Sequence, residues 1–262
     1  MPRKFVLAAL LLAASLAPNL ASSRAGAAEP TPEDRARWAR EAEERLHSDW
    51  AYLARYRGEN AHLVPARAPR IVFLGDSITQ GWIDKVPSYF GPGRVDRGIS
   101  GQTTGQMLVR FRQDVLSLKP AVVHIMAGTN DVAGNNGPES DSDIEGNIET
   151  MTELALAHGV RVILASIPPA ADFPWRPGLA PGPRIERLNR WIAGYAAREG
   201  AIYADYWTVL HDGPGFRAGL AYDGVHPSEA GYAAMAPVAE AAIARAFAAP
   251  SPVACGRRAA PR

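Results

Sequence analysis

Short, mostly apolar runs recur along the chain from about residue 70, and each is followed by a longer stretch whose apolar positions have helical spacing. The short runs predict strands at 71–74, 94–97, 121–126, 160–167 and 201–204. The longer stretches predict helices at 104–118, 142–158, 183–199 and 227–247. Strands that alternate with such helices favour an α/β fold with a parallel sheet covered on both faces.

Residues 31–57 have a charged pattern and predict one further helix. Thr31 can cap its N-terminus and Pro32 suits its first turn. Apolar side chains at roughly helical spacing give it one apolar face: Trp38, Leu46, Trp50, Leu53 and Tyr56. We expect this helix to pack on the main domain; a helix that binds a partner is the alternative.

The first 27 residues have the three parts of a secretory signal peptide. Arg3 and Lys4 form the positive region, and 5–17 form an apolar region that is short for a membrane span. Small residues at 25–27 offer a cleavage site. We therefore expect a cleaved, secreted or periplasmic protein, with an uncleaved anchor as the alternative. No later apolar run has membrane-spanning length, so no stable membrane insertion of the mature chain is expected.

These patterns divide the chain into a signal peptide (1–27), a helical extension (28–69), one α/β domain (70–248) and a tail rich in Pro and Arg (249–262). The tail is expected to be disordered. A domain of this length buries enough surface to fold without disulfides or metals. The single cysteine, Cys255, cannot form a disulfide within the chain.

Charge and composition exclude several classes of function. The formal net charge is +1 and the charged residues form no basic stripe, so nucleic acid is not an expected partner. Histidines and carboxylates are not gathered at metal-ligand spacing, and neither a metal nor an organic cofactor is expected. The oligomeric state cannot be inferred from the sequence.

A serine follows the first predicted strand directly. Residues 71–74 are apolar and lead into Gly75-Asp76-Ser77, which predicts a buried strand that ends in a tight turn. A serine between a strand and a helix lies beside free backbone N–H groups. Ser77 can therefore be a nucleophile and also contribute an N–H group to an oxyanion hole.

Three later segments can supply the partners that such a serine needs. Gly101 follows the second strand and is a candidate N–H donor, and Asn130 follows the third strand with a neutral side-chain amide donor. Asp223 and His226 are three positions apart, so one turn can hold both. The sequence thus predicts a triad of Ser77, His226 and Asp223 at the carboxyl ends of the strands, where ligands bind in open α/β sheets.

In composition and order, these segments resemble the four blocks of the SGNH hydrolases, also called GDSL esterases/lipases. The matching blocks are Gly75-Asp76-Ser77-Ile78-Thr79, Gly98-Ile99-Ser100-Gly101, Gly128-Thr129-Asn130-Asp131 and Asp223-Gly224-Val225-His226. The resemblance covers about residues 70–247, and Ile78 replaces the leucine of the family name, one aliphatic side chain for another. Residues 98–104 resemble the branch of platelet-activating-factor acetylhydrolase subunits and bacterial carbohydrate O-acetylesterases.

The resemblance implies a fold, an activity and roles for these residues. The implied fold is a flavodoxin-like, three-layer α/β/α sandwich with a five-stranded parallel sheet. The implied enzyme is a serine esterase in which Ser77 attacks, His226 takes its proton and Asp223 orients His226. The implied oxyanion hole consists of the backbone N–H groups of Ser77 and Gly101 and the amide of Asn130.

One loop and the lack of a lid segment bear on the substrate. The proline-rich segment 167–178 predicts a stiff loop near the site, in which Trp175 can contact a sugar or an acyl group; Trp82 is a weaker candidate for the same role. The chain has no long apolar segment that could form a lid, which favours short acyl esters, most simply O-acetyl groups on a glycan. The alternatives are a broad lysophospholipase or thioesterase, and a glycan-binding or O-acyltransferase relative.

Overall fold

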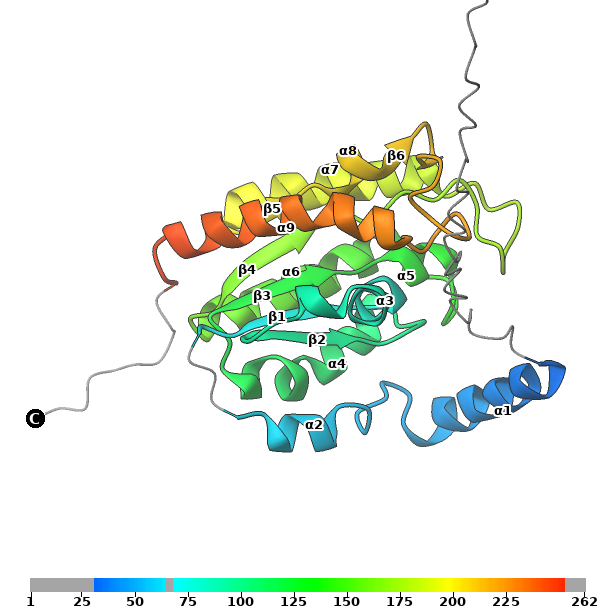
Figure 1. The fold of residues 1–262 in the computed structure, drawn as a ribbon, viewed down its shortest axis with the longest axis horizontal. Coiled ribbons are helices and arrows are strands. Elements are labelled where there is room, and N and C mark those ends of the chain that lie inside the picture. Colours follow the sequence, from blue (N-terminus) through cyan, green and yellow to red (C-terminus); the bar gives the residue numbers. More distant parts are fainter. Residues whose placement is uncertain (1–30, 65–67, 253–262) are drawn as a thin grey trace, which may run out of the picture. The chain divides into compact units, whose positions relative to one another are not determined.

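The computed structural model describes residues 31–64 and 68–252, and the chain divides into two compact units, Met1–Glu43 and Glu44–Arg262. The predicted signal peptide, 1–27, and most of the predicted tail, 249–262, lie outside the described residues. The described part contains an open α/β sheet with helices on both of its faces (Figure 1).

The continuous helix predicted for residues 31–57 is wrong. Helix α1 (Pro32–Ser48) ends before Asp49, and α2 (Arg57–His62) is a separate short helix. The Asp49 carboxylate accepts the N–H groups of Leu53 and Ala54, at 2.8 Å each, in place of helical carbonyls. Tyr52 adopts a left-handed conformation, with φ of 53°. Hydrogen bonds from the backbone to the Asp49 side chain thus replace helical hydrogen bonds, and the helix ends in a turn.

The sheet has five parallel strands in the order β2-β1-β3-β4-β5, which confirms the predicted fold class. The strands are β1 (Ile71–Gly75), β2 (Arg94–Gly98), β3 (Val122–Met126), β4 (Arg161–Ala165) and β5 (Ile202–Ala204). The chain passes from β1 to β2 on one side and then returns to place β3 on the other side. The strand order therefore reverses around β1, and in open α/β sheets ligands bind outside the carboxyl ends of the strands at such a switch point.

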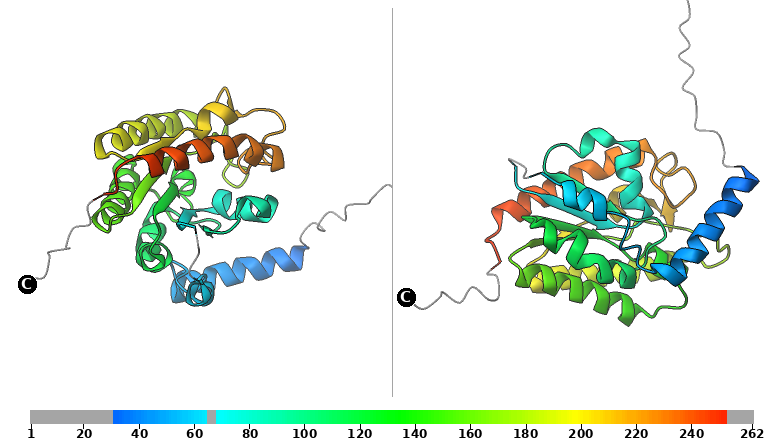
Figure 2. Two further views of the ribbon diagram at one scale, coloured as in Figure 1. Left: turned by 60° about the vertical axis from the view of Figure 1, so that its left-hand side comes forward. Right: turned by 90° about the horizontal axis from the view of Figure 1, so that it is seen from below.

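Helices cover both faces of the sheet, as the alternation of side chains in the strands requires. On one face, Val72 and Leu74 of β1 pack with α4 (Thr104–Asp114), α6 (Asp141–Ala157) and α7 (Gly182–Glu199). On the other face, Ile71 and Phe73 pack with α3 (Ser77–Lys85), α8 (Tyr206–Leu210) and α9 (Glu229–Ala248). The views in Figure 2 show the two helical layers with the sheet between them.

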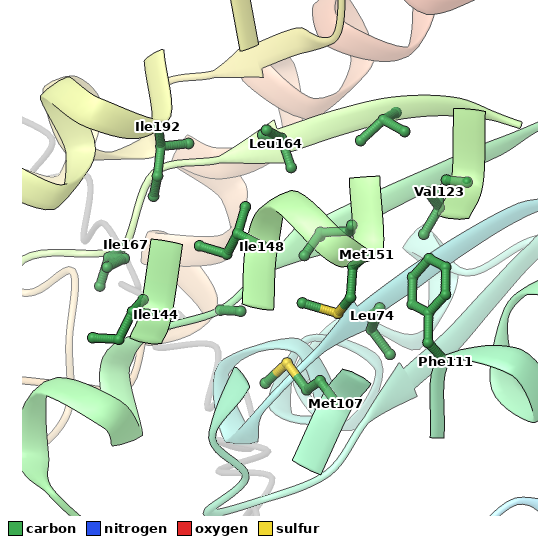
Figure 3. Packing of buried hydrophobic residues seen from close by; sticks show 14 of the residues in the cluster. Leu74, Met107, Phe111, Val123, Ile144, Ile148, Met151, Leu164, Ile167 and Ile192 are labelled. Atoms are coloured by element: carbon green, nitrogen blue, oxygen red, sulfur yellow. The ribbon is translucent and has the colours of Figure 1, made fainter. Parts of the chain in front are cut away.

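The larger core cluster fills the space between the sheet and α4, α6 and α7. Leu74 and Val123 of the sheet lie opposite Met107, Phe111 and Met151 (Figure 3). All five side chains are fully buried. Full burial of an apolar side chain of this size contributes about 1.5–3 kcal/mol. This packing fixes the strand ends from which the site residues project.

Smaller elements surround this framework. Two 3₁₀ turns, η1 (Pro87–Tyr89) and η2 (Leu116–Leu118), precede β2 and β3, and α5 (Thr129–Ala133) follows β3. A short antiparallel hairpin of β6 (His211–Asp212) and β7 (Gly215–Phe216) lies between α8 and the Asp223 turn, and the sequence pattern did not predict it. None of the described helices is long and apolar enough to cross a membrane.

Candidate active site

Ser77 is the first residue of α3, where β1 ends. The Asp76 side chain caps this helix by accepting the Ile78 N–H at 2.9 Å. Glycine is required at position 75, because a Cβ there would lie 2.0 Å from Thr79 Oγ1 and 2.8 Å from the Met126 carbonyl oxygen. The chain therefore turns sharply enough to present the half-buried Ser77 side chain at the carboxyl end of the sheet.

The predicted triad is assembled. Ser77 Oγ lies 2.9 Å from His226 Nε2, and His226 Nδ1 lies 2.7 Å from Asp223 Oδ2. The other carboxylate oxygen of Asp223 accepts the backbone N–H groups of Val225 and His226, at 3.0 and 2.7 Å. Gly224, with φ of 85°, allows this tight turn. One turn thus orients the imidazole and leaves its Nε2 directed at the serine.

The Asp223 turn keeps its carboxyl group ionised. Burial by itself would raise the pKa of Asp223, but the hydrogen bonds from the His226 ring and from the two backbone N–H groups outweigh it and hold the pKa below its usual range. An ionised Asp223 can compensate the charge of an imidazolium at His226.

The predicted oxyanion donors lie at the same edge of the sheet. The Ile99 N–H donates to the Gly75 carbonyl at 3.0 Å, which places the 98–101 segment beside the end of β1. The Asn130 amide Nδ2 donates to the Gln102 carbonyl at 3.1 Å and to Asp76 Oδ2 at 3.3 Å. Among the residues that the structure describes, the backbone N–H groups of Ser77 and Gly101 have no acceptor, so they remain available for an oxyanion.

The two tryptophans expected near the substrate differ in exposure. Trp175 is 42% exposed, and its ring centroid lies 6.1 Å from that of His226. Trp82 is 0% exposed and stacks between Tyr89 and Tyr232, so the expectation that it contacts the substrate is wrong. The reason is helical spacing: Trp82 lies four positions after the buried Ile78 and shares its core-facing side of α3.

Sequence reasoning did not identify Tyr222, which directly precedes the catalytic candidate Asp223. The Tyr222 ring is 64% exposed and stacks on the His226 ring at a centroid separation of 5.6 Å and an angle of 15°. Lys85 Nζ lies 5.5 Å from the centroid of the same ring. In the sequence, the position of this aromatic residue next to the candidate acid Asp223 could have indicated that it lies at the site. Tyr222 and Trp175 both contact His226 and give the rim of the site exposed aromatic surface.

Comparison with known proteins agrees with this geometry. Residues 73–234 match the GDSL-like Lipase/Acylhydrolase family. The chain belongs to this family. It is therefore a carboxylic ester hydrolase, and the family resemblance inferred from the sequence is confirmed.

Three known proteins are similar to this GDSL hydrolase. A GDSL-like lipase of Bacteroides thetaiotaomicron is 42% identical, with a TM-score of 0.73 over 76% of this chain and 100% of that one. Esterase TesA of Pseudomonas aeruginosa is 27% identical over 177 residues, which are 62% of this chain and 82% of the relative. An acetylxylan esterase of Geobacillus stearothermophilus is 22% identical and shares the fold, with a TM-score of 0.54 over 68% of this chain and 95% of that one.

A fully buried arginine lies beneath the site of this GDSL hydrolase. Arg110 Nη2 donates to the Gly75 carbonyl at 3.0 Å, and its Nε donates to Gln102 Oε1 at 2.5 Å. Its third partner is the Asp114 carboxylate, at 3.3 Å, which is also fully buried. Burial lowers the pKa of Arg110, and the charge of Asp114 opposes that change. Arg110 thus joins the turn that precedes Ser77 to the loop that carries Gly101.

The buried carboxylate of Asp131, next to Asn130, joins the Asn130 segment to the start of α4. Asp131 accepts the Thr104 N–H at 2.9 Å and the Thr104 hydroxyl, and the carboxyl group of Glu139 is its acidic neighbour. Two neighbouring carboxylates repel each other, so one of the two groups keeps its proton to a higher pH. Burial and this neighbour raise the pKa of Glu139 to about 8.

We expect the free energy of unfolding to fall as the pH rises towards 8. In the folded protein Glu139 keeps its proton up to about pH 8, whereas in the unfolded chain it ionises near its ordinary value of 4.5. The stabilising contribution is thus complete below about pH 4.5 and is lost as the pH rises through 8. Glu139→Gln has no carboxyl group to ionise at this position, so the decline between pH 5 and 8 should become about 1 kcal/mol smaller, after allowance for solvent screening.

Urea unfolding of both proteins at pH 5, 6, 7 and 8 measures this difference. Glu153→Gln, on the exposed side of α6, is the control and should leave the slope with pH unchanged within error. Parallel stability curves for wild type and Glu139→Gln would contradict the raised pKa of Glu139.

Among the described residues, no group of three or more His, Cys, Asp or Glu side chains is arranged to hold a metal ion.

Proposed function

We propose that this chain is an exported serine esterase that removes short acyl groups, most simply O-acetyl groups, from carbohydrates. The observation that carries the proposal is the aligned triad, in which Ser77 Oγ, His226 and Asp223 are joined by contacts of 2.9 and 2.7 Å beside free backbone N–H groups. A hydroxyl, a base and an orienting carboxylate in this geometry support nucleophilic acyl transfer.

The first half of the reaction forms an acyl-enzyme. Ser77 Oγ attacks the ester carbonyl carbon while His226 Nε2 takes the hydroxyl proton. The carbonyl oxygen becomes an oxyanion that accepts hydrogen bonds from the N–H groups of Ser77 and Gly101 and from the Asn130 amide. As the tetrahedral intermediate collapses, the ester C–O bond breaks and His226 gives its proton to the departing alcohol.

The second half releases the acid. Water takes the place of the alcohol, His226 removes its proton, and the resulting nucleophile attacks the acyl carbon. As the second tetrahedral intermediate collapses, the bond between the acyl carbon and Ser77 Oγ breaks, and His226 gives its proton to Ser77 Oγ. Asp223 remains ionised throughout and compensates the imidazolium in both halves.

The rim of the site supports a carbohydrate as the alcohol part. Trp175 is an exposed aromatic ring beside His226, and flat aromatic surfaces with a polar N–H group suit partly apolar, partly polar ligands. Tyr222 adds a second exposed ring, which stacks on the ring of His226. The fold shared with an acetylxylan esterase points in the same direction.

A substrate panel tests this proposal. We expect kcat/KM on p-nitrophenyl esters to be highest for acetate and to fall about tenfold or more by octanoate, because each added methylene must find space in a site built for a small acyl group. Acetylated xylooligosaccharides should release acetate. The measurements are initial rates of p-nitrophenol and of acetate release.

Other outcomes would replace the proposal. A preference for octanoate or palmitate would favour a lysophospholipase or thioesterase. Glycan binding without acetate release would favour a binding protein, and transfer of the acetyl group to a second sugar rather than to water would favour an O-acyltransferase.

The proposed export rests on the sequence alone. Residues 1–27 have the charge, the apolar run and the small residues of a cleavable signal. A polymeric acetylated glycan would be met outside the cytoplasm, so the proposed substrate class and the proposed location are consistent with each other.

A further inference from the structure

The loop that carries Trp175 is attached to the end of α5, the helix that carries Asn130. Arg176, the next residue, donates from Nη1 to the carbonyl oxygens of Ala133 and Gly134, at 2.6 and 2.9 Å. The indole Nε1–H of Trp175 donates to Asn135 Oδ1 at 2.9 Å. The exposed aromatic ring at the rim of the site is therefore fixed to the residue that follows α5 and its Gly134 cap.

Asn135 continues this connection to the proposed oxyanion donor. Its Nδ2 donates to Asn130 Oδ1 at 2.5 Å, and its backbone N–H donates to the Asn130 carbonyl at 3.0 Å. The Asn130 Nδ2 is thereby directed to the opposite side, where it donates to the Gln102 carbonyl and to Asp76. Three side chains are joined in series: the Trp175 indole, the Asn135 amide and the Asn130 amide.

The direction of this series is specified by its first member, and the Gln102 carbonyl, which can only accept, favours the same orientation of Asn130 at the other end. An indole N–H can only donate, so the atom of Asn135 that faces it must be the oxygen. The NH₂ group of Asn135 must then face Asn130, and the atom of Asn130 that faces Asn135 must be its oxygen. The Asn130 NH₂ group is consequently the end that faces the 98–102 segment, as an oxyanion donor requires.

We infer that Asn135 is a positioning residue that holds the Asn130 amide in its donating orientation, and that it couples this orientation to Trp175. The inference rests on the proposed function, because it requires Asn130 to be an oxyanion donor. The terminal torsion of an asparagine is broad and nearly two-fold, so without Asn135 only the contacts with the Gln102 carbonyl and with Asp76 oppose reversal of the amide. A reversed Asn130 would present its carbonyl oxygen to the developing oxyanion and would repel it.

The coupling gives Trp175 two separable contributions. Its ring offers a surface to the alcohol part of the substrate, which affects KM for a glycan. Its N–H group orients Asn135 and, through it, Asn130, which affects kcat for every ester. Trp175→Phe keeps an aromatic ring and removes the N–H donor, so this variant separates the two contributions.

The test compares kcat and KM of the full-length protein and its variants on p-nitrophenyl acetate and on an acetylated xylooligosaccharide. We expect Asn130→Ala to lower kcat by about 10² to 10³, the usual loss for one oxyanion donor. Asn135→Ala and the isosteric Asn135→Asp, which cannot donate to Asn130, should each lower kcat about tenfold to a hundredfold on both substrates. KM for p-nitrophenyl acetate should stay within about twofold in each case.

Trp175→Phe should lower kcat on p-nitrophenyl acetate about tenfold with KM unchanged. The double variant of Asn135→Ala with Trp175→Phe should be no slower than Asn135→Ala alone, because both changes interrupt one series of hydrogen bonds. Trp191→Phe is the matched control: Trp191 stacks on Tyr195 in α7, and the same change there should leave kcat as in the wild type.

The outcomes distinguish this inference from the proposed function. Unchanged kcat in Asn135→Asp and Trp175→Phe, with a large loss in Asn130→Ala, would overturn the positioning role and leave the esterase mechanism intact. A rise in KM alone for Trp175→Phe would also overturn it. Unchanged kcat in Asn130→Ala would instead contradict the oxyanion role on which the inference rests.

Discussion

Ser77→Ala is expected to lower kcat/KM on acyl esters by about 10⁴ to 10⁶, the scale on which serine hydrolases lose activity without their nucleophile. The Ser77 hydroxyl is the atom that lies 2.9 Å from the His226 base, and alanine leaves that base with nothing to deprotonate. The backbone N–H groups and the Asn130 amide remain, so a small activity above the uncatalysed rate should persist. Initial rates on p-nitrophenyl acetate measure the loss.

Ser77→Ala should leave the fold intact, because the side chain is half-buried and the cap of α3 is supplied by Asp76. Ser117→Ala, an exposed serine in the 3₁₀ turn before β3, is the control and should retain wild-type rates. A serine-directed fluorophosphonate should label the wild type and the Ser117 variant but not the Ser77 variant. Full esterase activity in Ser77→Ala would refute the proposed mechanism.

Arg110→Met is expected to lower the free energy of unfolding by about 3–5 kcal/mol, because it removes one partner of a fully buried ion pair. Asp114 would keep the neutral Asn60 amide, at 2.7 Å, as its hydrogen-bond partner among the described residues. The Gly75 carbonyl and Gln102 Oε1 would lose their charged donor as well. Urea unfolding at neutral pH measures the effect.

Two further variants identify the cause of that loss. Arg112→Met, on the exposed side of the same helix, should change the stability by less than about 0.5 kcal/mol. Adding Asp114→Leu to Arg110→Met removes the unpaired charge and should recover a large part of the loss. If the double variant were as unstable as Arg110→Met, the cost would lie in the lost packing and the Gly75 contact rather than in an uncompensated Asp114.

The sequence predicted the parts of this protein that depend on local pattern. The apolar run before Gly75 marks β1 because a strand buried on both faces needs apolar side chains on both. Ser77, His226 and Asp223 could be paired in advance because the order of the blocks resembles a known family, and because an acid three positions before a histidine fits one turn.

Features that depend on contacts between distant segments could not be predicted in this way. Trp82 lies five residues after Ser77, and only its orientation on α3 places it in the core. Asn135 has no recognisable motif, and its role follows from Trp175, which is 40 positions away. In the sequence, nothing distinguishes Arg110 from an exposed charged residue of a helix, and only the structure shows that it is buried with Asp114.

The wide separation of Ser77 and His226 along the sequence determines when the active site can form during folding. The hydroxyl of Ser77 and the imidazole that activates it are 149 positions apart, and the Tyr232 hydroxyl, in α9, donates to the Ile78 carbonyl in α3. Contacts of such long range carry a high loop-closure entropy and favour slow folding. A chain interrupted anywhere between Ser77 and His226 would contain the nucleophile without its base, so the full triad forms only when the first and last segments of the domain have met.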